Sequence, residues 1–204
     1  MQANRGMPNQ CRSLGRIRDT NVLISNFVTQ GRSEVKSAVV VVAKVNFRDE
    51  ELLEPKEILE KNNVVVRIAS TSPGEITGML GAKVKADILI KDINVQEFDA
   101  IVFVGGTGAS QYWNDPVAHK LIQDALRNEK IVAAICIAPV TLANSGILKG
   151  KRATVWSSES GQLKANGAVY TAGNVETDGN IITAAGPFAA REFGEELAKL
   201  ILSK

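Results

Sequence analysis

From residue 37 onward, apolar β-branched segments alternate with helix-length stretches of mixed polarity, and this alternation constrains the fold most. The expected strands are Ala38–Val45, Val64–Ala69, Ala100–Val104 and Ile131–Ile135. Near-continuous apolar strands are typical of parallel sheets, because helices cover both faces of such sheets. The pattern therefore predicts an α/β sandwich with a central, mostly parallel sheet.

The segments between these strands carry helix and turn signals. Pro55 lies within an apolar helical pattern, so we expect the regular helix to begin close to Glu51, because proline is tolerated in a first turn. Asn114-Asp115-Pro116 is a good start for a helix that runs to about Asn128. Glycines and alternating apolar residues predict a small β-hairpin excursion over residues 73–90.

The last third of the chain is expected to complete the sheet and to close with a helix. The expected elements are short helices over 139–144 and 158–165, a strand over Ala153–Trp156, and a hairpin over 175–184 that turns at Asp178-Gly179. The closing helix, Phe188–Leu202, is amphipathic, and its inward residues are predicted to be Phe188, Phe193, Leu197, Leu200 and Ile201.

Residues 1–36 differ from the rest of the chain in pattern and in charge. They hold six basic and only two acidic residues and lack hydrophobic periodicity. We expect a flexible basic N-terminal extension that adds little to stability, followed by one folded domain over residues 37–204. The alternatives are a targeting segment and an additional docked element.

Composition argues against several classes of function. No apolar run approaches the ~18 to 20 residues of a membrane span, so we do not expect the chain to act at a membrane. The sequence also lacks a basic stripe and has few aromatic residues for base stacking, so we do not expect it to bind nucleic acid. Two cysteines, Cys11 and Cys136, and one histidine, His119, make neither a disulfide framework nor a zinc ligand set. We therefore expect no metal, no organic cofactor and a cytoplasmic location.

Cys136 is the strongest candidate for chemistry, because parallel α/β folds bind ligands at the carboxyl ends of their strands. Ala134-Ile135-Cys136-Ile137-Ala138 passes directly from an expected strand into a helix. Its small residues two positions before and after the cysteine suit a nucleophile elbow, whose sharp turn brings the flanks together. A helix N-terminus would favour the thiolate. The alternative is an inert, buried cysteine at a strand end.

Gly105-Gly106-Thr107-Gly108 follows the preceding expected strand and would expose backbone N–H groups. The N–H of Gly106, together with that of Ile137, could form an oxyanion hole. A plain tight turn is one alternative. A dinucleotide-binding loop is another, although it would lack its third glycine and would come late in the chain.

Glu51 is the candidate acid, because it follows the first expected strand. Its alternative role is that of a solvated acid at a helix start, shared with Asp49 and Glu50. His119 falls on the third expected helix and is interpreted as an ordinary surface histidine. A Cys–His dyad would require that helix to lean over Cys136.

Together these motifs resemble the ThiJ/PfpI superfamily over residues 37–203. The matching segments are Gly74-Glu75-Ile76-Thr77-Gly78, Val84-Lys85-Ala86-Asp87, Phe98-Asp99-Ala100 with Gly105-Gly106, Ala133–Cys136 with Ala138-Pro139, and Gly186-Pro187. The resemblance implies a flavodoxin-like three-layer sandwich, usually a homodimer, with its nucleophile at Cys136. It also implies that Glu51, four residues before Pro55, is a protonated acid that hydrogen-bonds the thiolate.

Two positions depart from the family pattern. PfpI-like proteases carry histidine directly after the cysteine, where this chain has Ile137, and deglycase or glyoxalase members often carry it twenty residues later, where this chain has Trp156. We expect Trp156 to face Cys136 and, with Gly105, to line its pocket. Peptide hydrolysis needs a general acid for the amine leaving group, which disfavours an intracellular cysteine peptidase.

The sequence thus predicts a cysteine-dependent enzyme, a glyoxalase- or deglycase-like hydrolase or lyase. Its expected substrates are small reactive aldehydes or their adducts on glycated proteins. Cys136 is the expected nucleophile, Glu51 the proton carrier, and the N–H groups of Gly106 and Ile137 the oxyanion donors. The main alternative is a non-enzymatic redox sensor or chaperone-like dimer.

Overall fold

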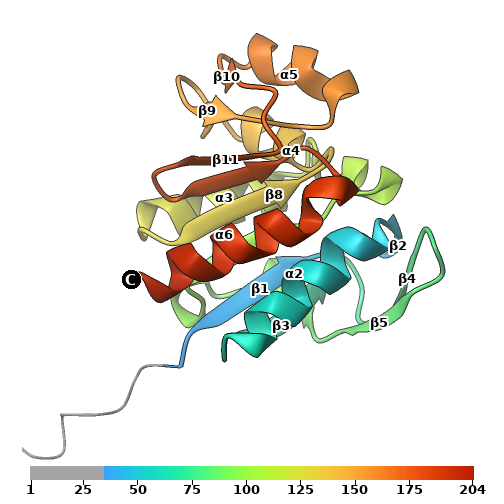
Figure 1. Ribbon diagram of the computed structural model, residues 1–204. Coiled ribbons are helices and arrows are strands. Elements are labelled where there is room, and N and C mark those ends of the chain that lie inside the picture. The colour runs from blue at the N-terminus through green and yellow to red at the C-terminus, as the bar shows by residue number, and fades with distance from the viewer. Residues whose placement is uncertain (1–34) are drawn as a thin grey trace, which may run out of the picture. The chain divides into compact units, whose positions relative to one another are not determined.

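A seven-stranded sheet forms the middle layer of the computed structural model, which describes residues 35–204 (Figure 1). The strand order is β11-β12-β8-β7-β1-β3-β6, and all neighbours are parallel except β11 and β12. The strands are β1 (Ser37–Val41), β3 (Val65–Ser70), β6 (Ile88–Leu89), β7 (Ala100–Phe103), β8 (Ile131–Ile135), β11 (Val175–Asp178) and β12 (Ile181–Ala184). The predicted α/β class with a mostly parallel sheet is confirmed.

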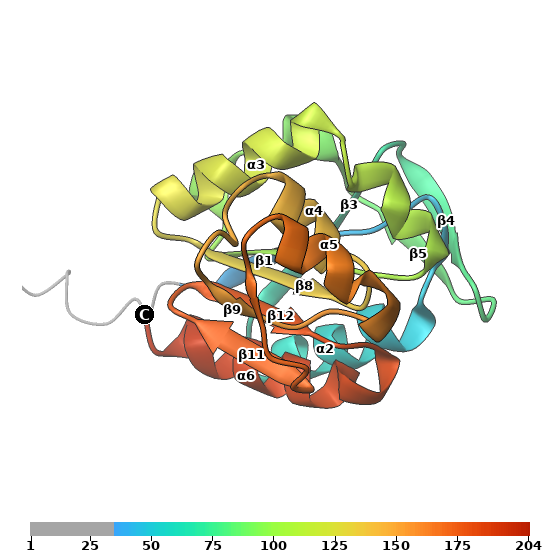
Figure 2. The same cartoon turned by 90° about the horizontal axis from the view of Figure 1, so that it is seen from above.

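Helices cover both faces of this sheet (Figure 2). On one face lie α2 (Asp49–Lys61) and α6 (Ala190–Leu202), and on the other lie α3 (Pro116–Arg127), α4 (Pro139–Asn144) and α5 (Ser160–Ala165). The alternation within β1 shows why both faces need cover: Val40 packs with α2 and α6, whereas Val39 and Val41 pack towards α3 and α4. This arrangement is the expected three-layer sandwich.

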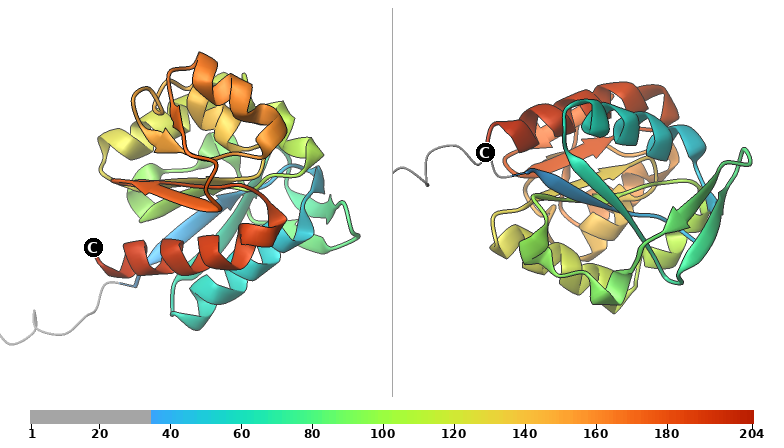
Figure 3. Two further views of the ribbon diagram at one scale, coloured as in Figure 1. Left: turned by 45° about the horizontal axis from the view of Figure 1, so that its top comes forward. Right: turned by 90° about the horizontal axis from the view of Figure 1, so that it is seen from below.

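Two smaller sheets complete the body. A hairpin of β4 (Gly74–Gly78) and β5 (Lys83–Ala86) projects beside the sandwich and pairs with the short β2 (Val45–Phe47) (Figure 3). This hairpin confirms the predicted excursion. The strands β9 (Arg152–Ala153) and β10 (Val169–Tyr170) form a separate parallel pair.

The first strand and the first helix differ from the prediction. The strand expected to run to Val45 ends at Val41, and the chain then bends so that β2 joins the hairpin instead. The helix α2 begins at Asp49, so Pro55 is its seventh residue and not part of its first turn. Pro55 packs closely on α6, where a Cβ added at Gly194 would lie 2.8 Å from the Pro55 Cα.

Two predictions for the last third of the chain were wrong. The strand expected over Ala153–Trp156 ends at Ala153, because the following segment leaves β10 and turns towards β12, where the Thr154 N–H donates to Thr183 Oγ1 (2.9 Å). Phe188 does not face inward: it is 66 % exposed in a 3₁₀ turn that precedes α6. Leu200 is only partly buried, whereas Phe193, Leu197 and Ile201 lie in the core as predicted.

The sheet register brings the candidate site together. Phe103 of β7 is level with Ala134 of β8, and Ala184 of β12 is level with Ile135. The segments that follow these strands therefore emerge at one edge, and they contain Gly105-Gly106, Cys136 and Gly186-Pro187.

The prediction for the N-terminal extension lies almost wholly outside the described residues. Within them, Lys36 already belongs to the body, because its carbonyl accepts the Val65 N–H (2.8 Å) and its ammonium pairs with Asp99 (3.4 Å). Across residues 35–204, no helix has the length and apolarity needed to cross a membrane. The same residues contain no group of three His, Cys, Asp or Glu side chains placed to hold a metal ion.

Candidate active site

Cys136 sits on the turn between β8 and α4, with φ +64°. This left-handed backbone is unusual for a non-glycine residue and marks a strained strand-to-helix turn. Hydrogen bonds to neighbouring segments hold it: the Cys136 N–H donates to Ala184 O (2.9 Å), and its carbonyl accepts the Trp156 N–H (2.8 Å). The side chain is 9 % exposed. The geometry is that of the elbow expected from the sequence.

The two glycines after β7 are required by close contacts. A Cβ at Gly105 would lie 2.5 Å both from the Cys136 Cβ and from the Glu51 Oε2, so any larger residue would separate thiol and carboxyl. Gly106 has φ +88°, and a Cβ there would lie 2.4 Å from the Arg48 backbone nitrogen. Both glycines therefore let segments far apart in the sequence meet at the sulfur.

Glu51 enters the site as the third residue of α2. Its side chain is fully buried, and neither carboxyl oxygen has a hydrogen-bond partner of standard geometry within residues 35–204. Burial raises the pKa of Glu51 to about 7, although the neighbouring Cys136 thiol, the Gly105 N–H and the Arg48 charge act in the opposite direction. A carboxyl with a pKa near neutral can both accept and donate a proton at working pH.

The Cys136 thiol is influenced by the same buried surroundings. Burial and the negative charge of ionised Glu51 raise the pKa of Cys136 to about 12, whereas the backbone N–H groups of Gly106 and Ile137 lower it by hydrogen bonding. The pair therefore retains a proton near neutral pH, and the charge of Glu51 keeps that proton on sulfur, which differs from the protonated Glu51 and the thiolate that the family resemblance implies. Transfer of the proton to Glu51 removes the repulsion that opposes the thiolate.

A pocket of about 210 Å³ opens beside the thiol. The residues that line it come from the turn before α2, the hairpin, the loops after β7 and β8, and the segments around residues 156 and 187. They are Arg48, Glu51, Met79, Gly106, Thr107, Cys136, Ile137, Trp156 and Pro187. Most of these groups are apolar, so the pocket suits a small organic molecule with few polar atoms.

Trp156 lines this pocket from a loop, although the strand predicted for it is absent. A Cβ at Gly186 would lie 2.7 Å from an indole carbon, and the Phe188 ring lies beside the indole with the ring centroids 6.3 Å apart. The indole is 39 % exposed. It therefore forms part of the pocket rim.

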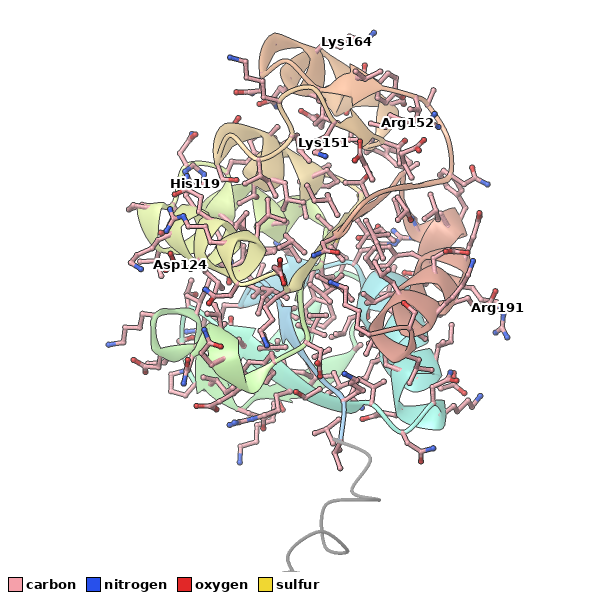
Figure 4. All side chains as sticks on the ribbon, turned by 90° about the vertical axis from the view of Figure 1, so that its left-hand side faces the viewer. His119, Asp124, Lys151, Arg152, Lys164 and Arg191 are labelled. Atoms are coloured by element: carbon pink, nitrogen blue, oxygen red, sulfur yellow. The ribbon has the colours of Figure 1, made fainter. Side chains whose placement is uncertain are left out.

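His119 is not among the residues lining the pocket. It lies on α3, across the sheet from Arg191 of α6 (Figure 4), and its ring Nε2 hydrogen-bonds the Trp113 carbonyl (2.8 Å). Trp113 in turn donates its indole N–H to the Ile137 carbonyl (3.1 Å). His119 thus holds Trp113, which in turn binds the backbone next to Cys136, and His119 itself does not line the thiol pocket.

Sequence reasoning missed several lining residues, namely Arg48, Met79, Thr107 and Pro187. Arg48 could have been suspected, because it is the one cation immediately before three consecutive acids that include Glu51. Met79 carried no such signal, because its place depends on how the hairpin packs against α2.

Comparisons with known proteins agree with this geometry. The model of the DJ-1/PfpI family matches residues 36–200. An uncharacterised protein of Methanocaldococcus jannaschii is 45 % identical over 83 % of this chain and 85 % of its own length. The deglycase PfpI of Pyrococcus furiosus is 29 % identical over 80 % and 98 % of the two chains.

Two further matches bear on function and fold. A protein of Caenorhabditis elegans named glutathione-independent glyoxalase is 26 % identical over 81 % of this chain and 89 % of its own. Among solved structures, a ThiJ/PfpI domain protein from Brachyspira murdochii has a TM-score of 0.81 and 34 % identity over 82 % and 97 % of the chains.

Proposed function

The chain belongs to the DJ-1/PfpI family, and on that premise we propose that it is a cysteine-dependent enzyme. The enzyme converts small 2-oxoaldehydes to 2-hydroxy acids, and it also acts on the related adducts on glycated proteins. The observation that carries the proposal is a thiol beside a buried carboxyl whose pKa is about 7 and whose oxygens make no hydrogen bond of standard geometry within residues 35–204. Relatives named deglycase and glyoxalase support the same class of chemistry.

The first step is addition of sulfur to the aldehyde. Glu51 takes the Cys136 thiol proton as the C–S bond forms, and the electron pair of the C=O bond moves to oxygen. The backbone N–H groups of Gly106 and Ile137 hydrogen-bond the sulfur, which supports the proposal that they stabilise that oxyanion. Glu51 then returns the proton to the oxygen, which gives a neutral hemithioacetal.

The second step moves a hydrogen within the adduct. Glu51 removes the hydrogen of the former aldehyde carbon as a proton, the electron pair forms a C=C bond to the ketone carbon, and the ketone oxygen becomes an enediolate oxygen. Glu51 then delivers the proton to the second carbon, and the proton of the first hydroxyl passes to the enediolate oxygen, which leaves a thioester. Water hydrolyses the thioester to a 2-hydroxy acid and the free thiol. The sequence consumes one water and needs no oxidant, reductant or cofactor.

Methylglyoxal is the appropriate probe, with D- and L-lactate measured as products. The wild-type chain is expected to form lactate, and Cys136→Ala to form none above the uncatalysed rate. Ser145→Ala, a buried substitution outside the pocket, is a control for handling and folding. Equal lactate formation by the wild type and Cys136→Ala would reject the proposed function.

A further inference from the structure

Arg48 is the only cationic side chain among the described residues that line the thiol pocket. It precedes α2, and its backbone N–H donates to the Gly105 carbonyl (3.2 Å). Its side chain is 31 % exposed, so it is accessible to a solute that enters the pocket. Nothing in the proposed reaction uses this charge.

The guanidinium is held in a fixed orientation by Glu50. Arg48 Nε donates to one Glu50 oxygen (2.9 Å) and Nη2 to the other (3.0 Å). This uses two of the five N–H groups of the side chain, and the guanidinium makes no other hydrogen bond within residues 35–204. Glu50 itself does not line the pocket. Three N–H groups of this pocket-lining residue therefore have no partner within residues 35–204 and are available to a small molecule.

We propose that Arg48 is a specificity residue that selects substrates carrying a carboxylate close to the reacting carbonyl. The inference rests on the proposed function and adds the substrate class. Gly106, whose N–H faces the sulfur, packs against the backbone nitrogen of Arg48, so the Arg48 side chain leaves the backbone beside the oxyanion donors. A planar guanidinium matches a carboxylate in geometry as well as in charge. Glu50 positions the guanidinium and partly offsets its charge.

The first experiment compares two alkylating agents and requires no turnover. Iodoacetate and iodoacetamide both react with a thiolate by the same displacement, in which a C–S bond forms and iodide leaves. Their rate ratio at Cys136 is independent of the thiolate fraction, because that fraction multiplies both rates. Mass spectrometry of the Cys136 peptide measures the ratio without interference from Cys11.

Arg48→Met is expected to lower the iodoacetate-to-iodoacetamide ratio about 3- to 10-fold, because an anion loses its attraction to the pocket. Glu50→Gln is expected to raise the ratio about 2-fold, because the guanidinium loses its offsetting charge. Arg127→Met removes the same charge from α3, outside the pocket, and should leave the ratio unchanged. Arg48→Lys keeps the positive charge, so its iodoacetate-to-iodoacetamide ratio should stay close to that of the wild type. This variant provides the test if Arg48→Met does not fold.

The second experiment uses a matched pair of 2-oxoaldehydes, 4,5-dioxopentanoate and its methyl ester. They share the reacting carbons and differ in one negative charge, and the acid would yield 2-hydroxyglutarate by addition of water. The wild-type kcat/KM is expected to favour the acid by about 3- to 10-fold over the ester. Arg48→Met should abolish this preference, and Arg127→Met should retain it.

The outcomes separate the two proposals. An alkylation ratio that is the same in wild type, Arg48→Met and Glu50→Gln overturns the anion site and leaves Arg48 as a partner of Glu50 alone. A ratio that changes as expected, in a protein that turns over neither methylglyoxal nor the dioxopentanoate pair, supports the anion site and rejects the proposed enzymatic activity.

Discussion

Two carboxylates in the first turn of α2, Asp49 and Glu51, are both buried but have opposite surroundings. Asp49 accepts hydrogen bonds from the backbone N–H groups of Leu80 (2.9 Å) and Ala82 (2.7 Å), which lie in the turn between β4 and β5. Glu51 faces the thiol and the Gly105 N–H, but its two oxygens make no hydrogen bond of standard geometry within residues 35–204. A buried acid with satisfied oxygens holds structure, whereas an unsatisfied one is available for chemistry.

The sharpest test of this contrast is the loss of charge at each position. We expect Glu51→Gln to lower kcat/KM for methylglyoxal by about 10²- to 10⁴-fold, because the amide cannot carry a proton. Asp49→Asn makes the same charge change two residues away and should cost less than about 10-fold. Lactate formation at pH 7.5 measures both. Equal losses would mean that Glu51 acts through structure alone.

Stability should depend on pH through Glu51. Its pKa is raised from 4.5 to about 7, so between these values the folded chain holds a proton that the unfolded chain releases. The stabilisation is complete below about pH 4.5 and is lost as the pH rises through about 7, by on the order of 3 kcal/mol. Glu51→Gln should lack this loss. Urea unfolding of both proteins between pH 4.5 and 8 gives the difference, and a difference that is constant with pH would contradict the assignment.

Asp49→Asn should lower the free energy of unfolding by about 1–3 kcal/mol, because one of the two N–H groups would then face a donor in place of an acceptor. The loss should be local. Hydrogen exchange is expected to accelerate at Leu80 and Ala82, while the amides of β8 keep their protection. If exchange in the hairpin turn does not change, Asp49 is not what fastens the hairpin to α2.

The smallest expected effect concerns whether Glu51 is the sole proton carrier. Trp156→His places an imidazole at the pocket rim and should raise methylglyoxal turnover about 10-fold, with a pH dependence near the imidazole pKa of about 6.5. In that background, Glu51→Gln should be less damaging than in the wild type. If rate and pH profile stay unchanged in a folded protein, the side chain at position 156 does not serve the thiol.

Local patterns in the sequence were sufficient for the architecture and for part of the site. Apolar strands and capped helices depend on neighbours along the chain, so β7, α3 and β8 lie close to where they were predicted. The elbow at Cys136 was visible for the same reason, since small residues on both sides of a strand-to-helix turn are a local requirement. The glycine pair after β7 belongs to this group as well.

Tertiary packing decided which groups meet the thiol. Asp49, Glu50 and Glu51 are three consecutive acids that the sequence does not distinguish. Successive side chains of a helix point about 100° apart, so the packing of α2 gives each acid a different partner. Asp49 binds the hairpin, Glu50 pairs with Arg48 and Glu51 faces Cys136. Gly194 leaves room for Pro55 where α2 packs on α6. Trp156 reaches the pocket from a loop that no periodicity indicates. The layers and the candidate nucleophile at Cys136 follow from local pattern in the sequence. The meeting of Glu51 with the thiol, which the family resemblance implied, and the proposed anion site depend on contacts between segments far apart in the chain.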